Sequence, residues 1–223
     1  MKSWSRVLPA LAALLLAACG GLKSGAVAPV TYLLRAPTDV AALVAPVAPR
    51  ADAGAAASAA ALTGMALRVE RPVAPPGFDT DRILLLREPR VLDYYAGSRW
   101  SGALPDMLGM LAIDTLRGTG AFTAVHDASA ALASDYSVRI TIRRYEADAT
   151  AGETPLVRVV LDVTVGRRAD RGVVATFVAE GEARAEAGRM RPVVAAFDAA
   201  TAAALRSVAT RTVEAVVADV KSH

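Results

Sequence analysis

The sequence predicts an α+β fold, in which a mainly antiparallel sheet carries two helices packed on one face. Residues 136–143, 156–165 and 173–183 alternate apolar and polar side chains, as expected for strands with one buried and one wet face. Residues 104–116, and the segment that follows Pro192, carry apolar side chains at helical spacing. The resulting order of strands, helix, strands and helix is typical of α+β proteins.

The first nineteen residues have the pattern of a lipoprotein signal. An apolar run over residues 7–18 follows two basic residues, and it is too short to cross a bilayer, which needs about 20 apolar residues. The run ends in Leu16-Ala17-Ala18-Cys19, which resembles a lipobox, where a small residue precedes a cysteine that receives diacylglycerol. We expect residues 1–18 to be a signal peptide and Cys19 to be the lipidated first residue. The alternative is a plain secretory signal that contains a cysteine.

The residues next to Cys19 and the net charge of the mature chain indicate which membrane holds the protein and which partners it binds. Gly20, rather than aspartate, follows the cysteine, which favours the periplasmic face of the outer membrane over the inner membrane. Cys19 is the only cysteine, so no disulfide is expected. Removal of Lys2 and Arg6 lowers the formal net charge from +3 to +1. Without a basic block, the sequence argues against nucleic acid as a partner.

Residues 19–64 are expected to form a tether and an Ala/Pro-rich segment that includes one short strand at residues 31–34. Residues 53–61 are almost entirely alanine and offer little large apolar surface to bury. Such a run favours helix only marginally, so we expect a linker that turns helical in part. The folded domain is expected over residues 65–223.

Shorter elements complete the predicted domain. Proline and glycine residues separate compact apolar runs, and Gly118 and Gly120 close the first helix. The expected strands are residues 67–69, 82–87, 91–95 and 122–125. The strand at 82–87 should pair with the strand at 91–95 as a hairpin.

The sequence lacks the side-chain patterns of common enzyme sites. His126 lies beside Asp127, and a histidine with no partner at metal-ligand spacing is typical of a surface pair. The second histidine is the C-terminal residue, which is expected to fray. Glu180 and Glu182 share one strand face, where they are expected to meet arginines. With no nucleophile elbow and no phosphate-binding loop, we expect no catalysis, no cofactor and no metal.

The densest group of aromatic and cationic residues is Tyr94, Tyr95, Arg99 and Trp100, and we call it the aromatic cluster. Such residues are enriched in protein interfaces, so the cluster is a candidate partner-binding surface. The alternative places Trp100 in the core at the start of a helix. Because adjacent strand residues face opposite ways, one of the two tyrosines should be exposed.

These features together resemble the ABC-type transport auxiliary lipoproteins, the PqiC-like family. The resemblance covers nearly all of the mature chain, and the order of its elements carries more weight than any single motif. This chain departs from the usual pattern in Ser101-Gly102-Ala103 after the tryptophan, and in Asp198 where asparagine is common. The matching features, in order, are the lipobox, Tyr32-Leu33-Leu34, Pro72 and Pro76 leading to Asp81-Arg82-Ile83, Arg99-Trp100 before a helix with Leu104, and Phe177-x-x-Glu180 before a helix near Val194-Ala195-Ala196-Phe197.

The resemblance implies a non-catalytic role beside an ABC permease, its ATPase and a periplasmic MCE-domain protein, which together move lipids between the inner and outer membranes. The lipoprotein would dock the MCE component at the outer membrane, and it could form a homo-oligomer. A docking module should expose aromatic or strand-edge surface. The alternative, a periplasmic lipid carrier, should hold an apolar pocket of at least a few hundred Å³. A third reading is a stabilising lipoprotein with no role in transport.

Overall fold

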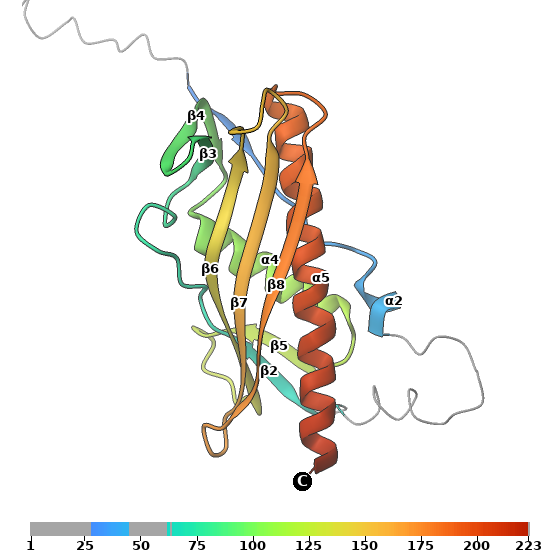
Figure 1. The fold of residues 1–223 in the computed structure, drawn as a ribbon. Helices are drawn as coiled ribbons and strands as arrows, with labels where there is room; N and C mark the ends of the chain where they lie inside the picture. Colours follow the sequence, from blue (N-terminus) through green and yellow to red (C-terminus); the bar gives the residue numbers. More distant parts are fainter. Residues whose placement is uncertain (1–27, 45–61, 63, 223) are drawn as a thin grey trace, which may run out of the picture.

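The computed structural model describes residues 28–44, 62 and 64–222, which form one eight-stranded sheet with helices on one face (Figure 1). The signal peptide, Cys19 and residues 53–61 lie outside the described residues. The elements are β1 (Val30–Tyr32), α2 (Val40–Val44), β2 (Ala66–Val69), β3 (Arg82–Glu88), β4 (Val91–Trp100), α4 (Leu104–Gly118), β5 (Ala124–Asp127), β6 (Tyr136–Asp148), β7 (Leu156–Arg167), β8 (Val173–Arg184) and α5 (Met190–Ser222).

Strands β6, β7 and β8 form an antiparallel unit, as the alternation predicts. Their inward side chains make up the helix-covered face, where the odd-numbered valines and leucine of β7, residues 157–165, are fully buried. The outward side chains make up the open face, which carries residues 139, 141 and 143 of β6, 158–164 (even numbers) of β7 and 176–182 (even numbers) of β8. Since side chains alternate across a strand, one face is apolar and the other charged.

The α+β class is confirmed, but the sheet is mixed and not purely antiparallel, so the expected strand arrangement is correct only in part. Three strand pairs are antiparallel, and four are parallel: β1 with β4, β2 with β5, β2 with β6, and β3 with β6. The chain between β3 and β6 passes through α4 on the helix-covered face before it returns to the sheet. A crossover of this kind brings strands back in the same direction, and alternation within each strand does not reveal it.

One irregularity in β6 changes which side chains are buried. The register with β7 shifts between Ile142 and Arg144, so two consecutive residues, Arg143 and Arg144, lie on the open side. Tyr145 therefore turns inward and is 1% exposed, and its hydroxyl lies 2.8 Å from the Thr201 hydroxyl of α5. A β-bulge that re-aims side chains in this way is a common feature of antiparallel pairs.

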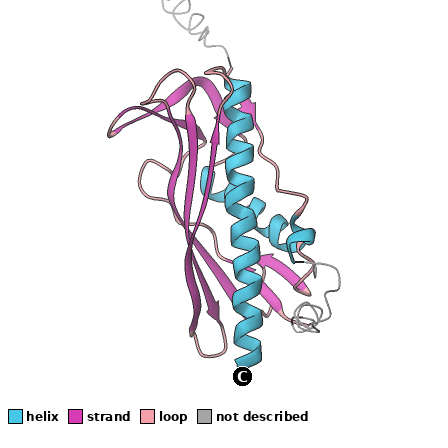
Figure 2. Cartoon of the chain, turned by 45° about the vertical axis from the view of Figure 1, so that its right-hand side comes forward, coloured by secondary structure: helices cyan, strands magenta, loops and turns pink. Residues whose placement is uncertain are grey.

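Helix α5 packs along β7 and β8, and Figure 2 shows the twisted strands to one side of it. A Cβ atom placed on Gly181 of β8 would lie 1.9 Å from the Ala200 carbonyl oxygen, so only glycine permits this close approach. With 33 residues, α5 is long and apolar enough to cross a membrane by composition. Its apolar side is instead buried against the sheet, which accounts for that composition.

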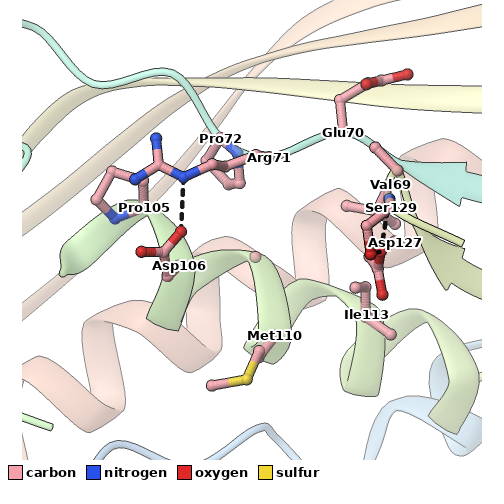
Figure 3. A pocket seen from close by; sticks show the side chains of 12 residues that line it. Val69, Glu70, Arg71, Pro72, Pro105, Asp106, Met110, Ile113, Asp127 and Ser129 are labelled. Carbon is pink, nitrogen blue, oxygen red and sulfur yellow. Dashed lines mark hydrogen bonds and ion pairs between the residues drawn. The ribbon is translucent and has the colours of Figure 1, made fainter. Parts of the chain in front are cut away.

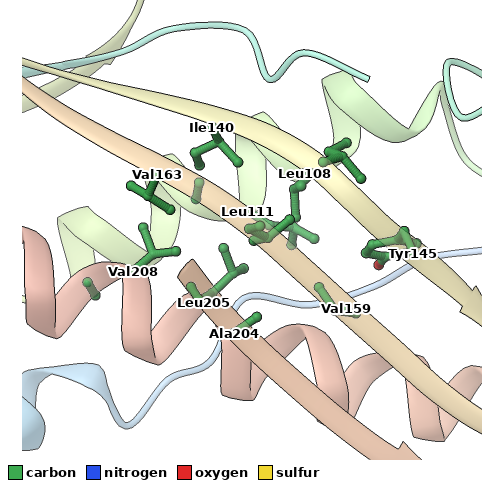
Figure 4. Packing of buried hydrophobic residues seen from close by; sticks show 14 of the residues in the cluster. Leu108, Leu111, Ile140, Tyr145, Val159, Val163, Ala204, Leu205 and Val208 are labelled. Carbon is green, nitrogen blue, oxygen red and sulfur yellow. The ribbon is translucent and has the colours of Figure 1, made fainter. Parts of the chain in front are cut away.

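Helix α4 packs beside α5 and completes the core. Gly118 ends the helix and Gly120 adopts φ 64°, as the predicted closure requires. Figure 4 shows side chains of α4, α5, β6 and β7 meeting in one cluster. The members labelled there are Leu108, Leu111, Ile140, Tyr145, Val159, Val163, Ala204, Leu205 and Val208.

The N-terminal segment 28–44, expected as part of the tether, is built into this fold. β1 pairs with β4, and Leu34 and Val40 are 8% and 1% exposed. Asp39 forms an ion pair with Arg206 of α5 at 2.9 Å, and the Arg35 backbone N–H donates to Asp198 at 3.2 Å. Isolated apolar residues in a proline-rich stretch gave no periodicity from which this packing could be predicted.

Two edges of the sheet are capped by arginines from the helices. Arg211 of α5 donates to the Val178 carbonyl of β8 at 2.9 Å and lies over the Phe177 ring at 4.3 Å. Arg117 of α4 donates to the Val125 carbonyl of β5 at 2.9 Å. These contacts satisfy strand-edge carbonyls that would otherwise invite pairing with another chain.

Candidate functional site

The aromatic cluster lies along β4, in the antiparallel hairpin that β4 forms with β3. Tyr94 is 44% exposed, and the Arg82 guanidinium lies 4.0 Å from the centre of its ring. Tyr95 faces the opposite side and is half-buried, and burial raises the pKa of its hydroxyl. One tyrosine is thus exposed, as strand alternation predicts.

Trp100 is a core residue, so the interface prediction is wrong for this member of the cluster. It is 2% exposed, and its ring meets the Phe197 ring of α5 edge-to-face, with centroids 5.1 Å apart. Phe197 in turn stacks on Tyr145 at 5.4 Å. Trp100 ends β4, four residues before α4 begins, and from this corner its side chain enters the space between sheet and helices.

Arg99 stays at the surface beside the N-terminal strand. Its guanidinium lies 3.8 Å from the Asp81 carboxylate, and about half of its side chain is exposed. In the parallel pairing of β1 with β4, Thr31 is opposite Arg99 and Tyr32 is opposite Trp100. The chain that follows the predicted anchor therefore runs directly against the aromatic cluster.

A groove of about 340 Å³ lies between α4, the segment after β2 and the end of β5 (Figure 3). Its floor is apolar, while ionic side chains stand at both ends, including Arg71, which pairs with Asp106 at 2.6 Å. Gly109 of α4 allows close packing, since a Cβ there would lie 3.0 Å from the Pro72 ring. Sequence reasoning missed this groove, and Gly109 within a helical pattern was its only local signal.

His126 is a buried structural residue and not the surface residue expected. It is 5% exposed, and its ring nitrogens lie 3.0 Å from the Asp127 carbonyl oxygen and 3.4 Å from that of Ala133. The Asp127 carboxylate accepts hydrogen bonds from the Ser129 hydroxyl and from the Ser129 backbone N–H, the latter at 2.7 Å, and these two bonds lower the pKa of the carboxyl. Across residues 28–44, 62 and 64–222, no three His, Cys, Asp or Glu side chains gather as metal ligands.

The carboxylates and arginines of the open face pair with each other. Arg158 contacts Glu182 at 3.0 Å and Asp148 at 2.5 Å, which confirms that Glu182 meets an arginine. Arg143 pairs with Asp162 at 2.7 Å. Such an arrangement can order a surface and select a partner by charge, and it provides no convergent acid and base.

Comparison with known proteins identifies the family to which this fold belongs. The family described as the ABC-type transport auxiliary lipoprotein component matches residues 48–209. The chain belongs to this family. Its members are lipoproteins that serve as auxiliary components of transport, which makes this protein a membrane-anchored, periplasm-facing component of that kind. No functionally curated protein matches the sequence.

Two solved structures share the fold of this auxiliary lipoprotein, and a third is less similar. A protein from Xanthomonas campestris of the family DUF330 is 22% identical over 87% of this chain and 98% of its own, with a TM-score of 0.67. An uncharacterized protein is 10% identical over 87% and 99%, with a TM-score of 0.55. A putative lipoprotein from Caulobacter crescentus is 12% identical over 75% and 98%, with a TM-score of 0.41. The first two show that the fold recurs at low sequence identity.

Proposed function

We propose that this auxiliary lipoprotein is the non-catalytic docking component of an ABC/MCE-type lipid transport system, anchored at the periplasmic face of the outer membrane. Membership of the transport auxiliary family is the observation that carries the proposal. The partners are a periplasmic MCE-domain protein and, through it, the permease and ATPase. ATP is hydrolysed by another subunit, so this chain needs only binding surfaces.

The anchor is the lipidated Cys19, and its distance from the fold limits the orientation of the domain. The eight residues between Cys19 and Ala28 span at most about 30 Å. The β3–β4 and β6–β7 turns, residues 89–90 and 149–155, lie at the same end of the molecule as β1, and we call this the hairpin end (Figure 1). The anchor therefore holds the hairpin end near the membrane.

The docking surface is centred on the exposed members of the aromatic cluster, Tyr94, Arg99 and the accessible part of Tyr95. Aromatic and arginine side chains on a strand next to exposed Val91 and Leu92 form a surface suited to a protein partner. Trp100 supports this surface from below. Because β1 pairs with β4, tension on the anchor acts directly on the docking strand.

The second candidate function is the lipid carrier, which the groove of Figure 3 favours. Its apolar floor could hold a short hydrocarbon chain. Yet the groove lies at the margin of the cluster of side chains that joins the helices to the sheet, with Val69 and Ile113 shared between them, and it has ionic side chains at both ends. The inward side chains of β7 are fully buried by that cluster, which supports docking over the carrier.

A pull-down from detergent-solubilised membranes tests the proposal. Tagged wild-type protein and the Cys19→Ala variant are compared, and co-purifying proteins and phospholipids are identified by mass spectrometry. We expect an MCE-domain protein with the wild type and less of it with Cys19→Ala. Bound phospholipid without any such protein would replace docking with the carrier.

Surface variants then locate the interface. Tyr94→Ser should reduce recovery of the MCE-domain protein at least about fivefold, since aromatic hot spots are typically worth more than 1 kcal/mol. Val178→Ser is the matched control, because Val178 is similarly exposed, at 40%, on the open face. Equal recovery with both variants would remove the aromatic cluster from the interface.

A further inference from the structure

The end of the molecule opposite the hairpin end contains a polar cleft of about 340 Å³. It lies between the start of β6, the end of β7 and the β7–β8 turn, residues 168–172. Figure 1 shows this turn at the same end of the molecule as the last turns of α5. We call this the arginine end. Helix α5 separates the two ends by about 50 Å, given a rise of 1.5 Å per residue.

The cleft has an excess of positive charge. Four arginines line it, and one of them, Arg167, is neutralised by Asp170 at 2.9 Å and Asp219 at 3.0 Å. Glu70 is the one carboxylate in the lining that the structure describes, and it pairs with Arg68 at 3.2 Å. The other three arginines form no ion pair within the described residues. They are Arg139, Arg168 and Arg171.

Neutral hydrogen-bond donors and open space accompany this charge. Ser137 of β6 is opposite Gly166 of β7, and Arg139 is opposite Thr164, so two hydroxyl side chains line the same cleft as Arg139. A Cβ placed on Gly166 would lie 3.4 Å from the Ser137 hydroxyl oxygen. The glycine thus leaves room beside that hydroxyl, where a larger side chain would fill the cleft.

The turn that carries Arg168 and Arg171 is held in place. The Arg167 N–H donates to the Gly172 carbonyl at 2.8 Å, and the Gly172 N–H donates to the Asp170 carboxylate at 2.9 Å. The Arg168 N–H donates to the Asp135 carbonyl at 2.9 Å. Arg171 adopts φ 60°, a left-handed conformation that favours glycine or asparagine. Residues held in such strained conformations are concentrated at functional sites, so Arg171 at this position supports a role for the turn in binding.

We propose that this cleft binds a phosphate group. Arginine matches phosphate oxygens through paired N–H donors, and hydroxyl groups add neutral donors without further charge. Three arginines that form no ion pair in the described part of the chain, two hydroxyls and the space beside Gly166 provide the donors and the room that one phosphate group needs. The phosphate belongs either to a phospholipid headgroup or to a small soluble phosphate. The inference rests on the cleft alone and does not require the proposed docking role.

Titration calorimetry of the full lipoprotein in detergent micelles at low salt tests the proposal, with inorganic phosphate as the probe. The wild type should bind, and added sodium chloride should weaken binding because it screens the arginines. Arg168→Gln and Arg171→Gly should each raise the dissociation constant about tenfold, the usual worth of one charge-assisted hydrogen bond. Arg171→Gly also relieves the left-handed backbone, so lost binding cannot be ascribed to misfolding.

Arg90→Gly is the matched control. Arg90 also adopts a positive φ, of 77°, in a surface turn, but at the hairpin end. Its substitution should leave phosphate binding unchanged. The proposal is overturned if the wild type binds no phosphate, if Arg171→Gly binds as the wild type does, or if Arg90→Gly loses binding equally.

A second probe identifies the source of the phosphate. Glycerophosphoglycerol presents the phosphodiester of a lipid headgroup without acyl chains. Tighter binding of this probe than of inorganic phosphate supports the site and assigns it to a headgroup, while the reverse order supports the site and assigns it to a small soluble phosphate. If both probes bind Arg168→Gln as tightly as wild type, the cleft is not the site.

Discussion

The two faces of the β6–β7–β8 unit differ in almost every respect, although the same strands build both. On the helix-covered face the side chains of β7 are fully buried, and α5 approaches β8 closely enough to require Gly181. On the open face the same strands carry ion pairs such as Arg143 with Asp162. The side chains of the covered face are buried against the helices and stabilise the fold. Binding is therefore expected of the open face and of the two ends of the molecule.

The largest effect is expected at the centre of the covered face. Phe197→Ala removes a fully buried ring that contacts Trp100 and Tyr145, and it should lower the free energy of unfolding by about 4 kcal/mol. Tyr94→Ala, which truncates the exposed ring of the aromatic cluster, should cost less than about 1 kcal/mol. Urea denaturation of both variants measures the difference, and similar losses would contradict the division between core and surface.

A second prediction concerns the contact between α5 and β8. Gly181→Ala should cost about 3 kcal/mol, since the new Cβ would overlap the α5 backbone and force the helix to move. Gly166→Ala on the open side of β7 is the control, because its nearest neighbour would be the Ser137 hydroxyl at 3.4 Å. It should stay within about 0.5 kcal/mol of wild type. An unchanged Gly181→Ala midpoint in urea would show that α5 does not lie this close to the sheet.

The sequence reveals these two faces far better than it reveals the sheet that contains them. Strict alternation in residues 156–165 identifies each buried side chain of β7, because the period depends only on the strand itself. The parallel pairing of β3 with β6 depends instead on a crossover through α4, which no local pattern records. The β6 bulge after Ile142 likewise reverses the expected alternation and buries Tyr145.

The candidate sites follow the same division between local and distant information. Tyr94 is exposed as alternation predicts, whereas the burial of Trp100 depends on Phe197, almost a hundred residues later in the sequence. The groove beside Gly109 and the cleft at the arginine end form where segments distant in sequence meet. Composition alone could not place three arginines from two elements in one cleft.

A smaller and pH-dependent effect is expected where the β7–β8 turn joins α5. The Arg167 guanidinium lowers the pKa of the Asp170 carboxyl from 3.8 to about 2, so ionised Asp170 stabilises the folded turn. This contribution is complete above the unfolded pKa and is lost as the pH falls through about 2. Asp170→Asn should therefore melt at a lower temperature than wild type at pH 6, with the difference closing toward pH 2. A difference that does not vary with pH in scanning calorimetry would exclude this electrostatic cause.

The smallest effect is expected for an ion pair of the open face. Arg143→Gln breaks the 2.7 Å contact with Asp162, but the arginine side chain is 60% exposed. Exposed pairs contribute little, so the change in unfolding free energy should be below about 0.5 kcal/mol. A loss of unfolding free energy comparable to that of Gly181→Ala would mean that the open face also contributes substantially to stability.

The proposed docking role requires that the covered face be filled by the protein's own side chains, with no lipid held there. The direct measurement is the phospholipid content of an unlipidated form, exported with an ordinary cleavable signal and purified from the periplasm without detergent. Lipid is extracted and quantified by mass spectrometry against protein concentration. The account predicts far less than one phospholipid per chain held by the covered face. One tightly held phospholipid per chain that Arg168→Gln also retains would contradict it, since that variant weakens the cleft at the arginine end.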